Sequence, residues 1–321
     1  MNSLLRKINV PEKRIGNYLL PPGIDIFERG WLSANNILLY CDADVSLVDT
    51  GYCAHQQMTV NLVTNALEQH QLTGLNKVVN THLHSDHCGG NAALSTIFDS
   101  EIWIPEAEAI AVQDWDENLL SFQQLGQECP RFMHQALLVP GEEIVLGPYR
   151  WQILAAPGHD NHSIMLYQEQ HQILISADAL WEEGFGVIFP ELWGEAGFEG
   201  VAQTLELIEG LSVALVIPGH GKPFTEVKTS IETAKSRLDY LSSDADRNAR
   251  HGAKVLLKYK LLEWQSQEMA KVNQWILGTP ALESIRQQMN LSDEDFQGWL
   301  VQALVKSKAA VIEQGMLVNL D

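Results

Sequence analysis

The sequence has little positive charge and no long apolar run. Its 321 residues include 21 Lys and Arg against 41 Asp and Glu, which gives a formal net charge of -20 at pH 7. A surface with this excess of negative charge repels nucleic-acid phosphates and anionic lipid headgroups. No segment approaches the roughly 18 to 20 consecutive apolar residues of a transmembrane helix. We therefore expect neither a nucleic acid nor a membrane among the partners.

Cysteine is scarce, and its spacing forms no motif. The four cysteines, Cys41, Cys53, Cys88 and Cys129, include no CxxC pair. This pattern favours reduced thiols over a disulfide framework. The first 23 residues contain apolar runs of three residues or fewer, too short for the apolar core of a secretory signal. Together these features predict a cytoplasmic protein.

The composition is globular, with 45% apolar and 19% charged residues, and the chain has two different textures. Short apolar strands alternate with helical patterns through about residue 224, which predicts an α/β or α+β sandwich. From residue 225 long helical patterns dominate, and no strand is predicted before a hairpin around residues 313–315. The order helix, turn, helix, small β-wing is typical of a winged helix. We therefore expect two domains, residues 1–224 and a helical, winged-helix-like domain at residues 225–321.

One short segment carries a cluster of metal-ligand side chains. Residues 81–91 read THLHSDHCGGN and directly follow the predicted strand KVVN. Four potential ligands, His82, His84, Asp86 and His87, fall within six positions, where a loop can turn them toward one point. Imidazole nitrogens suit zinc, while the carboxylate leaves iron and manganese as alternatives. A single histidine is commonly structural, but four clustered ligands indicate a metal site.

Three more potential ligands follow predicted strands. His159 lies in a PGH sequence, Asp178 ends the strand QILISA, and His220 lies in PGHG. With the first cluster they make five histidines and two aspartates. This set suffices for two metal ions if one carboxylate bridges them, and a metal pair about 3.5 to 4 Å apart is typical of hydrolytic sites.

The motifs HLHSDH, PGH, the strand-end aspartate and PGHG, in this order, resemble those of the metallo-β-lactamase-fold hydrolase superfamily over roughly residues 20–225. Asp49-Thr50-Gly51 matches the first motif of that family. The resemblance implies an α+β fold, a four-layer αββα sandwich, followed here by a mostly α-helical C-terminal domain. It implies this ligand set: His82, His84 and His159 on the first metal, Asp86, His87 and His220 on the second, Asp178 between them, and Asp49 orienting a ligand histidine.

An aspartate, where the dizinc β-lactamases have a cysteine ligand, makes the sequence more similar to the glyoxalase II and lactonase branch. We expect two divalent metal ions, zinc before iron or manganese, that share a hydroxide at pH 7. This hydroxide would attack the carbonyl of a small ester, thioester or lactone while the metals stabilise the oxyanion. Asp86 is the candidate catalytic residue that orients the water or moves its proton.

Substrate contacts are less well defined by the sequence. Trp181, Phe185 and Trp193 lie in an aromatic, glycine-rich segment after Asp178, and a second aromatic segment spans residues 115–134. His162 departs from the family's usual PGHTxG sequence and is a candidate proton donor or substrate contact. These side chains would wall an apolar pocket, or else pack in the core or at a dimer contact. A small, uncharged, apolar substrate fits the first interpretation.

Three other functions stay open. A mononuclear iron dioxygenase acting on a thiol adduct, of the persulfide dioxygenase type, would use only His82, His84 and His159. A phosphodiesterase or nuclease, and a winged-helix binding protein with a vestigial hydrolase domain, would need a basic surface. Residues 225–321 instead hold 12 Lys and Arg against 13 Asp and Glu. We expect this tail to close the active-site cleft or to form a homodimer.

Overall fold

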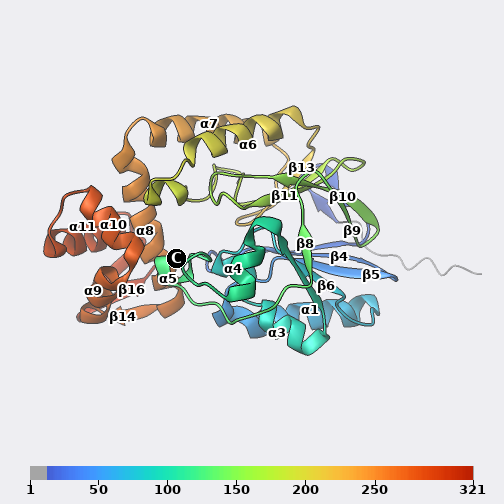
Figure 1. Ribbon diagram of the computed structural model, residues 1–321, viewed down its shortest axis with the longest axis horizontal. Helices are drawn as coiled ribbons and strands as arrows, with labels where there is room; N and C mark the ends of the chain where they lie inside the picture. Colours follow the sequence, from blue (N-terminus) through green and yellow to red (C-terminus); the bar gives the residue numbers. More distant parts are fainter. Residues whose placement is uncertain (1–12, 321) are drawn as a thin grey trace, which may run out of the picture.

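The computed structural model describes residues 13–320, and two large mixed β-sheets face each other at its centre (Figure 1). The first sheet has the order β3-β4-β5-β6-β7-β8, and the second has the order β13-β12-β11-β10-β9. The first sheet comprises β3 (Ile24–Phe27), β4 (Asn36–Cys41), β5 (Asp44–Val48), β6 (Lys77–Val79), β7 (Glu101–Pro105) and β8 (Ala136–Leu138). The second comprises β9 (Glu143–Leu146), β10 (Tyr149–Ala155), β11 (Ile164–Gln168), β12 (Ile173–Ala177) and β13 (Leu215–Pro218).

The pairing of the strands brings the carboxyl ends of several strands to one edge of the sandwich. In the first sheet β5, β6, β7 and β8 run parallel, whereas β3, β4 and β5 are antiparallel. In the second sheet only β12 and β13 are parallel. β4 and β5 form a hairpin, in which Cys41 pairs with Asp44 across a two-residue turn. A short antiparallel ribbon of β1 (Arg14–Ile15) and β2 (Tyr18–Leu19) precedes the first sheet.

Alternation of apolar side chains along the strands builds separate cores on the two faces of each sheet. In β4, Ile37 and Leu39 enter the core between the sheets, while Leu38 enters the core under the first helical layer. This period of two is what a strand covered on both faces requires. Trp151 of β10 is fully buried between the sheets.

Helices cover both outer faces and complete the sandwich (Figure 1). α1 (Gln56–His70) and α3 (Asn91–Phe98) bury apolar side chains against the first sheet. α6 (Phe198–Gly210) and α7 (Val227–Ser242) do the same on the second sheet. The predicted four-layer αββα sandwich is therefore confirmed. Shorter helices lie in the connections: α2 (Ser85–Cys88), α4 (Ala109–Asp114), α5 (Phe122–Leu125), and the 3-10 turns η1 (Cys53–His55), η2 (Glu106–Glu108) and η3 (Pro190–Trp193).

The C-terminal region is mostly helical and packs around an apolar core at Leu257 and Phe296, which also includes Leu125, Val187 and Leu192 of the preceding region. Its elements are α8 (Ala245–Trp264), β14 (Ser266–Glu268), α9 (Met269–Gly278), α10 (Pro280–Gln288), α11 (Asp293–Lys306), β15 (Ala310–Glu313) and β16 (Met316–Asn319). The expectation of no strand before the final hairpin is wrong, because β14 pairs with β16. Gln265, at a φ of 60°, ends α8 and lets the chain turn into β14.

Helix α7 lies beyond the predicted boundary at residue 224 but packs with the sandwich. Ile231, Ala234 and Leu238 join the same apolar cluster as α6. By its contacts α7 belongs to the outer helical layer, and the helices around the C-terminal core begin with α8. Within residues 13–320, no helix combines the length and the hydropathy needed to span a bilayer.

Candidate metal centre

The seven predicted ligands meet at one edge of the sandwich, where strands of both sheets end. β6 ends at Val79, and the loop into α2 carries the cluster that begins at His82. His159, Asp178 and His220 follow β10, β12 and β13 in the same way. Open sheets commonly bind ligands outside the carboxyl ends of their strands, because the connecting loops are free to present side chains there.

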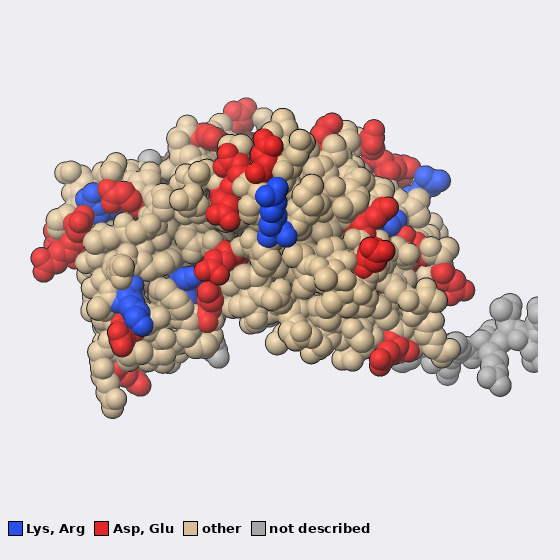
Figure 2. Space-filling view, turned by 60° about the horizontal axis from the view of Figure 1, so that its bottom comes forward, with Lys and Arg blue, Asp and Glu red and all other residues tan. Residues whose placement is uncertain are grey.

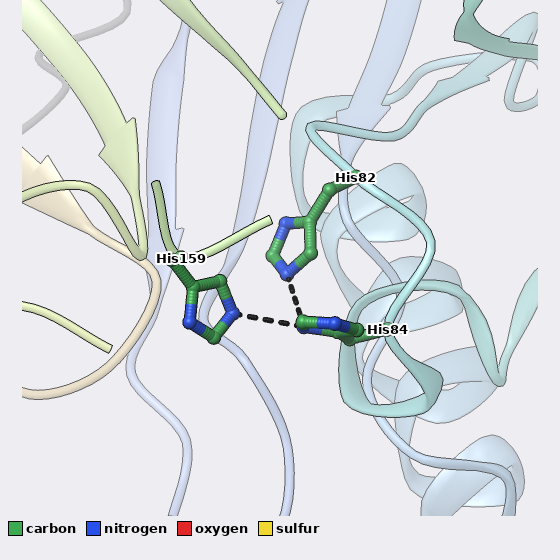
Figure 3. A group of neighbouring side chains, drawn as sticks. All are labelled: His82, His84 and His159. Carbon is green, nitrogen blue, oxygen red and sulfur yellow. Dashed lines mark hydrogen bonds between the residues drawn. The ribbon is translucent and has the colours of Figure 1, made fainter. Parts of the chain in front are cut away.

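The first ligand group consists of three histidines from two loops (Figure 3). Nε2 of His82 lies 3.0 Å from Nδ1 of His84, which lies 2.8 Å from Nε2 of His159. Burial, together with the neighbouring imidazoles, lowers the pKa of His82 and lowers that of His159 to about 4. Both rings are therefore neutral at pH 7 and keep a lone pair for a metal ion.

The second group comes from α2 and from the loop after β13. Nε2 of His220 lies 3.0 Å from Oδ2 of Asp86, and Nε2 of His87 lies 4.0 Å from the same oxygen. Burial opposes ionisation of Asp86, but His87 and His220 outweigh it and lower the pKa of the carboxyl group. The group thus pairs two imidazoles with an ionised carboxylate.

Asp178 lies between the two groups. Its Oδ1 is 3.5 Å from Nε2 of His87, while its Oδ2 is 3.4 Å from Nε2 of His159 and 3.9 Å from Nε2 of His220. The backbone after β13 passes so close that a Cβ at Gly219 would collide with Oδ1 of Asp178. A glycine at this position therefore leaves room for the carboxylate.

Asp49 fixes the orientation of His87. Nδ1 of His87 lies 2.8 Å from Oδ2 of Asp49, whose carboxylate also accepts hydrogen bonds from the backbone N–H and the hydroxyl of Thr81 at 2.9 and 2.8 Å. Because Nδ1 of His87 faces Asp49, Nε2 is the ring nitrogen that points to the centre. Asp49 itself adopts a left-handed backbone conformation with a φ of 57°.

The donor set fits bound divalent metal ions. Nε2 of His87 is buried without a hydrogen-bond partner, and leaving such an atom unsatisfied costs about 1–3 kcal/mol. The imidazole of His159 is held by its Nδ1, which lies 2.6 Å from the carbonyl oxygen of Val187 and leaves Nε2 for the centre. Histidine nitrogens and carboxylate oxygens in this combination suit zinc, iron or manganese.

Two tryptophans flank the second group. Trp31 stacks on His220 with ring centroids 5.5 Å apart and planes 7° apart, and Trp181 meets the same imidazole edge-on at 5.5 Å. Nε1 of Trp181 also donates to Oδ1 of Asp178 at 3.3 Å. Trp181, predicted as a substrate contact, thus touches the ligands themselves. Sequence reasoning missed Trp31, because a tryptophan in a loop between two strands forms no pattern or motif.

A cavity of about 350 Å³ opens beside the first group and is lined in part by His84 and His159. Of the predicted substrate contacts, His162 and Trp193 line it. Phe185 does not: its side chain is 1% exposed and packs in the core under α6 and α7, below the guanidinium of Arg237. The prediction of Phe185 as a wall of this cavity is therefore not supported.

The predicted second segment, residues 115–134, reaches the cavity through residues other than its aromatic ones. Residues 118–121 and Gln124 line the cavity, whereas Phe122 and Phe132 are buried in the core of the first sheet. The aromatic side chains therefore anchor the segment, and its polar and aliphatic side chains face the open space.

His162 forms an ion pair at the cavity wall. Its Nδ1 lies 2.9 Å from Oε1 of Glu108, and this bond, together with nearby carboxylates, raises the pKa of His162 to about 9. Burial raises the pKa of Glu108 and outweighs the opposite effect of His162. Asp160 completes the group by accepting a 2.6 Å hydrogen bond from the backbone N–H of His162.

Comparisons with known proteins agree with this geometry. The family model described as Metallo-beta-lactamase superfamily matches residues 29–220. A hydroxyacylglutathione hydrolase of Bdellovibrio bacteriovorus is 25% identical over 160 residues, covering 50% of this chain and 50% of its own. An acyl-coenzyme A thioesterase of Homo sapiens is 29% identical over 160 residues, covering 46% of this chain and 56% of its own. The chain thus spans only about half the length of these two relatives.

A crystal structure of a metallo-beta-lactamase family protein from Thermus thermophilus superposes with a TM-score of 0.57 and 17% identity, covering 94% of this chain and 99% of the other. A beta-lactamase domain protein from Burkholderia ambifaria gives 0.51 and 18%, covering 94% and 92%. These likenesses bear on the fold alone. Because the family model covers more than half of the sequence and the strand ends carry its ligand motifs, the chain belongs to the metallo-beta-lactamase superfamily.

Proposed function

We propose that this protein is a dinuclear metal-dependent hydrolase that cleaves the acyl bond of a small ester, thioester or lactone. The observation that carries the proposal is the meeting of two complete ligand groups at one sheet edge, with Asp178 between them. His82, His84 and His159 would hold one ion, and Asp86, His87 and His220 the other. When bound, two divalent ions lower the pKa of a water molecule toward neutrality and stabilise negative charge on a carbonyl oxygen.

The residues around the ions prepare the site for this chemistry. Asp49 accepts a hydrogen bond from Nδ1 of His87, and the carbonyl oxygen of Val187 accepts one from Nδ1 of His159. Asp86 is ionised at neutral pH, since nearby imidazoles lower the pKa of its carboxyl group. As an ionised carboxylate it can accept a hydrogen bond from a water molecule and so orient it or pass its proton on, which is the role we assign to it.

Acyl transfer is the reaction that the named relatives favour. One is called a hydroxyacylglutathione hydrolase and the other an acyl-coenzyme A thioesterase. Both names describe substrates with a carbonyl carbon rather than a phosphodiester. We infer zinc as the physiological metal because histidine dominates the donor set.

A mononuclear iron dioxygenase would need only the first histidine group. The second group argues against this alternative, because His220 and Asp86 approach within 3.0 Å and the buried Nε2 of His87 has no other partner. The unpartnered Nε2 of His87 is costly to maintain without a second ion, whereas the contact between His220 and Asp86 shows that these two side chains converge.

The test is metal analysis together with hydrolysis of a panel of esters, thioesters, lactones and phosphodiesters. We expect about two zinc ions per chain and hydrolysis of at least one carbonyl substrate, lost in His84→Ala. His171→Ala is the matched control, since His171 precedes β12 at the opposite end of that strand from Asp178. One iron per chain with oxygen uptake on a persulfide, or full activity of His84→Ala, would refute the proposal.

A further inference from the structure

We infer that the cavity beside the first histidine group selects acyl compounds whose carrier group is neutral or cationic, and disfavours anionic carriers. This inference rests on the proposed function, because it concerns the substrate of the same site. It is carried by the charges on the cavity wall, the position of its apolar side chains and the charge of the surrounding surface.

The charged side chains that line the cavity are almost all acidic. Glu108, Asp160 and Glu195 line it together with three imidazoles, those of the proposed ligands His84 and His159 and that of His162. No Lys or Arg is among the lining residues in the part of the chain that the structure describes. An anionic carrier would therefore meet carboxylates without an arginine or lysine to bind it, whereas phosphate and carboxylate recognition normally uses these two cations.

His162 is the only histidine among the described lining residues that is not a proposed metal ligand, and its positive charge is already compensated. His162 is bound to Glu108 at 2.9 Å, so this pair contributes no net charge when both groups are ionised. Asp160 accepts the backbone N–H of His162 and lies 3.6 Å from Nε2 of His84. Glu195 is exposed and accepts a hydrogen bond from the side chain of Asn161 at 3.3 Å. Glu195 therefore keeps a negative charge at the open side of the cavity.

The wall also includes apolar side chains, beside neutral polar ones such as Asn118 and Gln124. The apolar side chains are Leu83, Leu119, Leu120, Phe189, Pro190 and Trp193. Leu119 is 66% exposed, so its side chain is accessible to a ligand in the cavity. A short acyl chain fits against these side chains and within about 350 Å³, while a carrier as large as coenzyme A must extend over the protein surface.

That surface is acidic as well. Of the net charge of -20, the 12 Lys and Arg and 13 Asp and Glu of residues 225–321 account for only -1, so residues 1–224 carry -19. Figure 2 shows acidic side chains scattered over one face of the molecule, with few basic ones between them. The negative charge of the surface therefore repels anionic carriers, as the carboxylates of the cavity wall do.

The experiment compares one acyl group on three thiols with the zinc-loaded, full-length protein. Butyryl thioesters of N-acetylcysteamine, thiocholine and coenzyme A supply a neutral, a cationic and an anionic carrier. Each kcat/KM is divided by the rate of alkaline hydrolysis of the same thioester, which removes differences in intrinsic reactivity. We expect the neutral and cationic thioesters to exceed the coenzyme A thioester by about tenfold or more, and the gap to narrow at 0.5 M NaCl because salt screens surface charges.

Two variants separate the local charge from the general field. Glu195→Lys should raise the ratio of kcat/KM for the coenzyme A thioester to kcat/KM for the neutral thioester by about threefold to tenfold, as expected for one charge reversal at an exposed site. Glu206→Lys makes the same change on the exposed face of α6, away from the cavity lining, and should have little effect.

The possible results distinguish this inference from the proposed function. Hydrolysis that is fastest with the coenzyme A thioester and slows with added salt would overturn the inference but leave the hydrolase proposal intact. Equal responses of Glu195→Lys and Glu206→Lys would also overturn it, since the cavity wall would then play no part. If no ester, thioester or lactone is cleaved by protein containing two zinc ions, the proposed function fails and the inference with it.

Discussion

Among single residues, Asp49 affects the proposed metal centre without being one of its ligands, because it orients the ligand His87. Its carboxylate holds the Nδ1 proton of His87 and is itself held by two hydrogen bonds from Thr81. Partners of this kind set the tautomer and orientation of a ligand histidine. The position follows β5 directly, which is why a sequence motif revealed it.

We predict that Asp49→Asn weakens binding of the second zinc ion by about 10- to 100-fold, the range typical for loss of such a partner. The first ion should be affected less, because Asp49 is linked to this group only indirectly, through the hydroxyl of Thr81, which lies 3.2 Å from Nδ1 of His82. Competition with a chromophoric chelator measures both affinities. Equal weakening of the two sites would show that Asp49 supports the whole loop rather than His87.

The pairing of His162 with Glu108 makes a prediction about pH. Glu108 raises the pKa of His162 from 6.5 to about 9, so the pairing stabilises the fold fully below pH 6.5 and its contribution is lost as the pH rises through about 9. His162 is partly exposed, so solvent screening reduces its contribution to stability.

In Glu108→Gln we expect the pKa of His162 to fall markedly toward its ordinary value, as followed by NMR of the imidazole in zinc-loaded protein. The difference in unfolding free energy between wild type and variant should shrink between pH 7 and pH 10. A titration midpoint that is the same in both proteins would contradict the pairing.

At the scale of elements, glycines in the loops after the strands leave room for the ligand side chains of the proposed metal centre. A Cβ at Gly219 would collide with the carboxylate of Asp178, and one at Gly186 would collide with the imidazole of His159. Gly298 on α11 is different, because it is exposed and a Cβ there meets nothing within 4 Å.

We therefore predict that Gly219→Ala displaces Asp178 and abolishes binding of at least one metal ion, as measured by metal content after dialysis. Gly298→Ala is the control: it should keep both ions and stabilise α11 by about 0.5–1 kcal/mol, because alanine favours helix over glycine. Normal metal content in Gly219→Ala would mean that the backbone after β13 shifts easily.

Elements with a clear period were predictable, and short irregular ones were not. The alternation in β4 and the strand ends before His82, Asp178 and His220 were visible in the sequence, because burial on both faces demands apolar strands. β14 was missed, since its three residues, Ser266–Glu268, are polar and follow a strong helical pattern. The sequence left cavity lining and core packing open for Phe185, because an aromatic residue in a loop looks the same in both cases, and the structure buries it in a core.

At the scale of the whole molecule, the C-terminal region supports the cavity from behind. Nδ2 of Asn248 on α8 donates to the carbonyl of Ile188, and the hydroxyl of Ser284 on α10 donates to that of Leu192. Trp193, which lines the cavity, also packs against the C-terminal core. From the sequence we expected this region to close the active-site cleft or to form a homodimer. The structure adds that α8 and α10 pack on η3, the segment beside the cavity.

The sandwich as a whole serves to bring distant strand ends together. His82 and His220 are separated by 138 positions in the sequence, yet both border His87, with ring centroids 4.0 and 5.7 Å from its ring. The family motifs predicted which residues meet, whereas the tryptophans on His220 and the acidic cavity wall required the structure.

The central claim is that this fold assembles two metal sites and not one. The most direct measurement is the zinc content per chain of wild type, His220→Ala and His171→Ala after equilibrium dialysis at a fixed free zinc concentration. We predict about two ions for wild type and His171→Ala, and about one for His220→Ala, because only the second group loses a ligand. One ion in the wild type, or two in His220→Ala, would contradict the account.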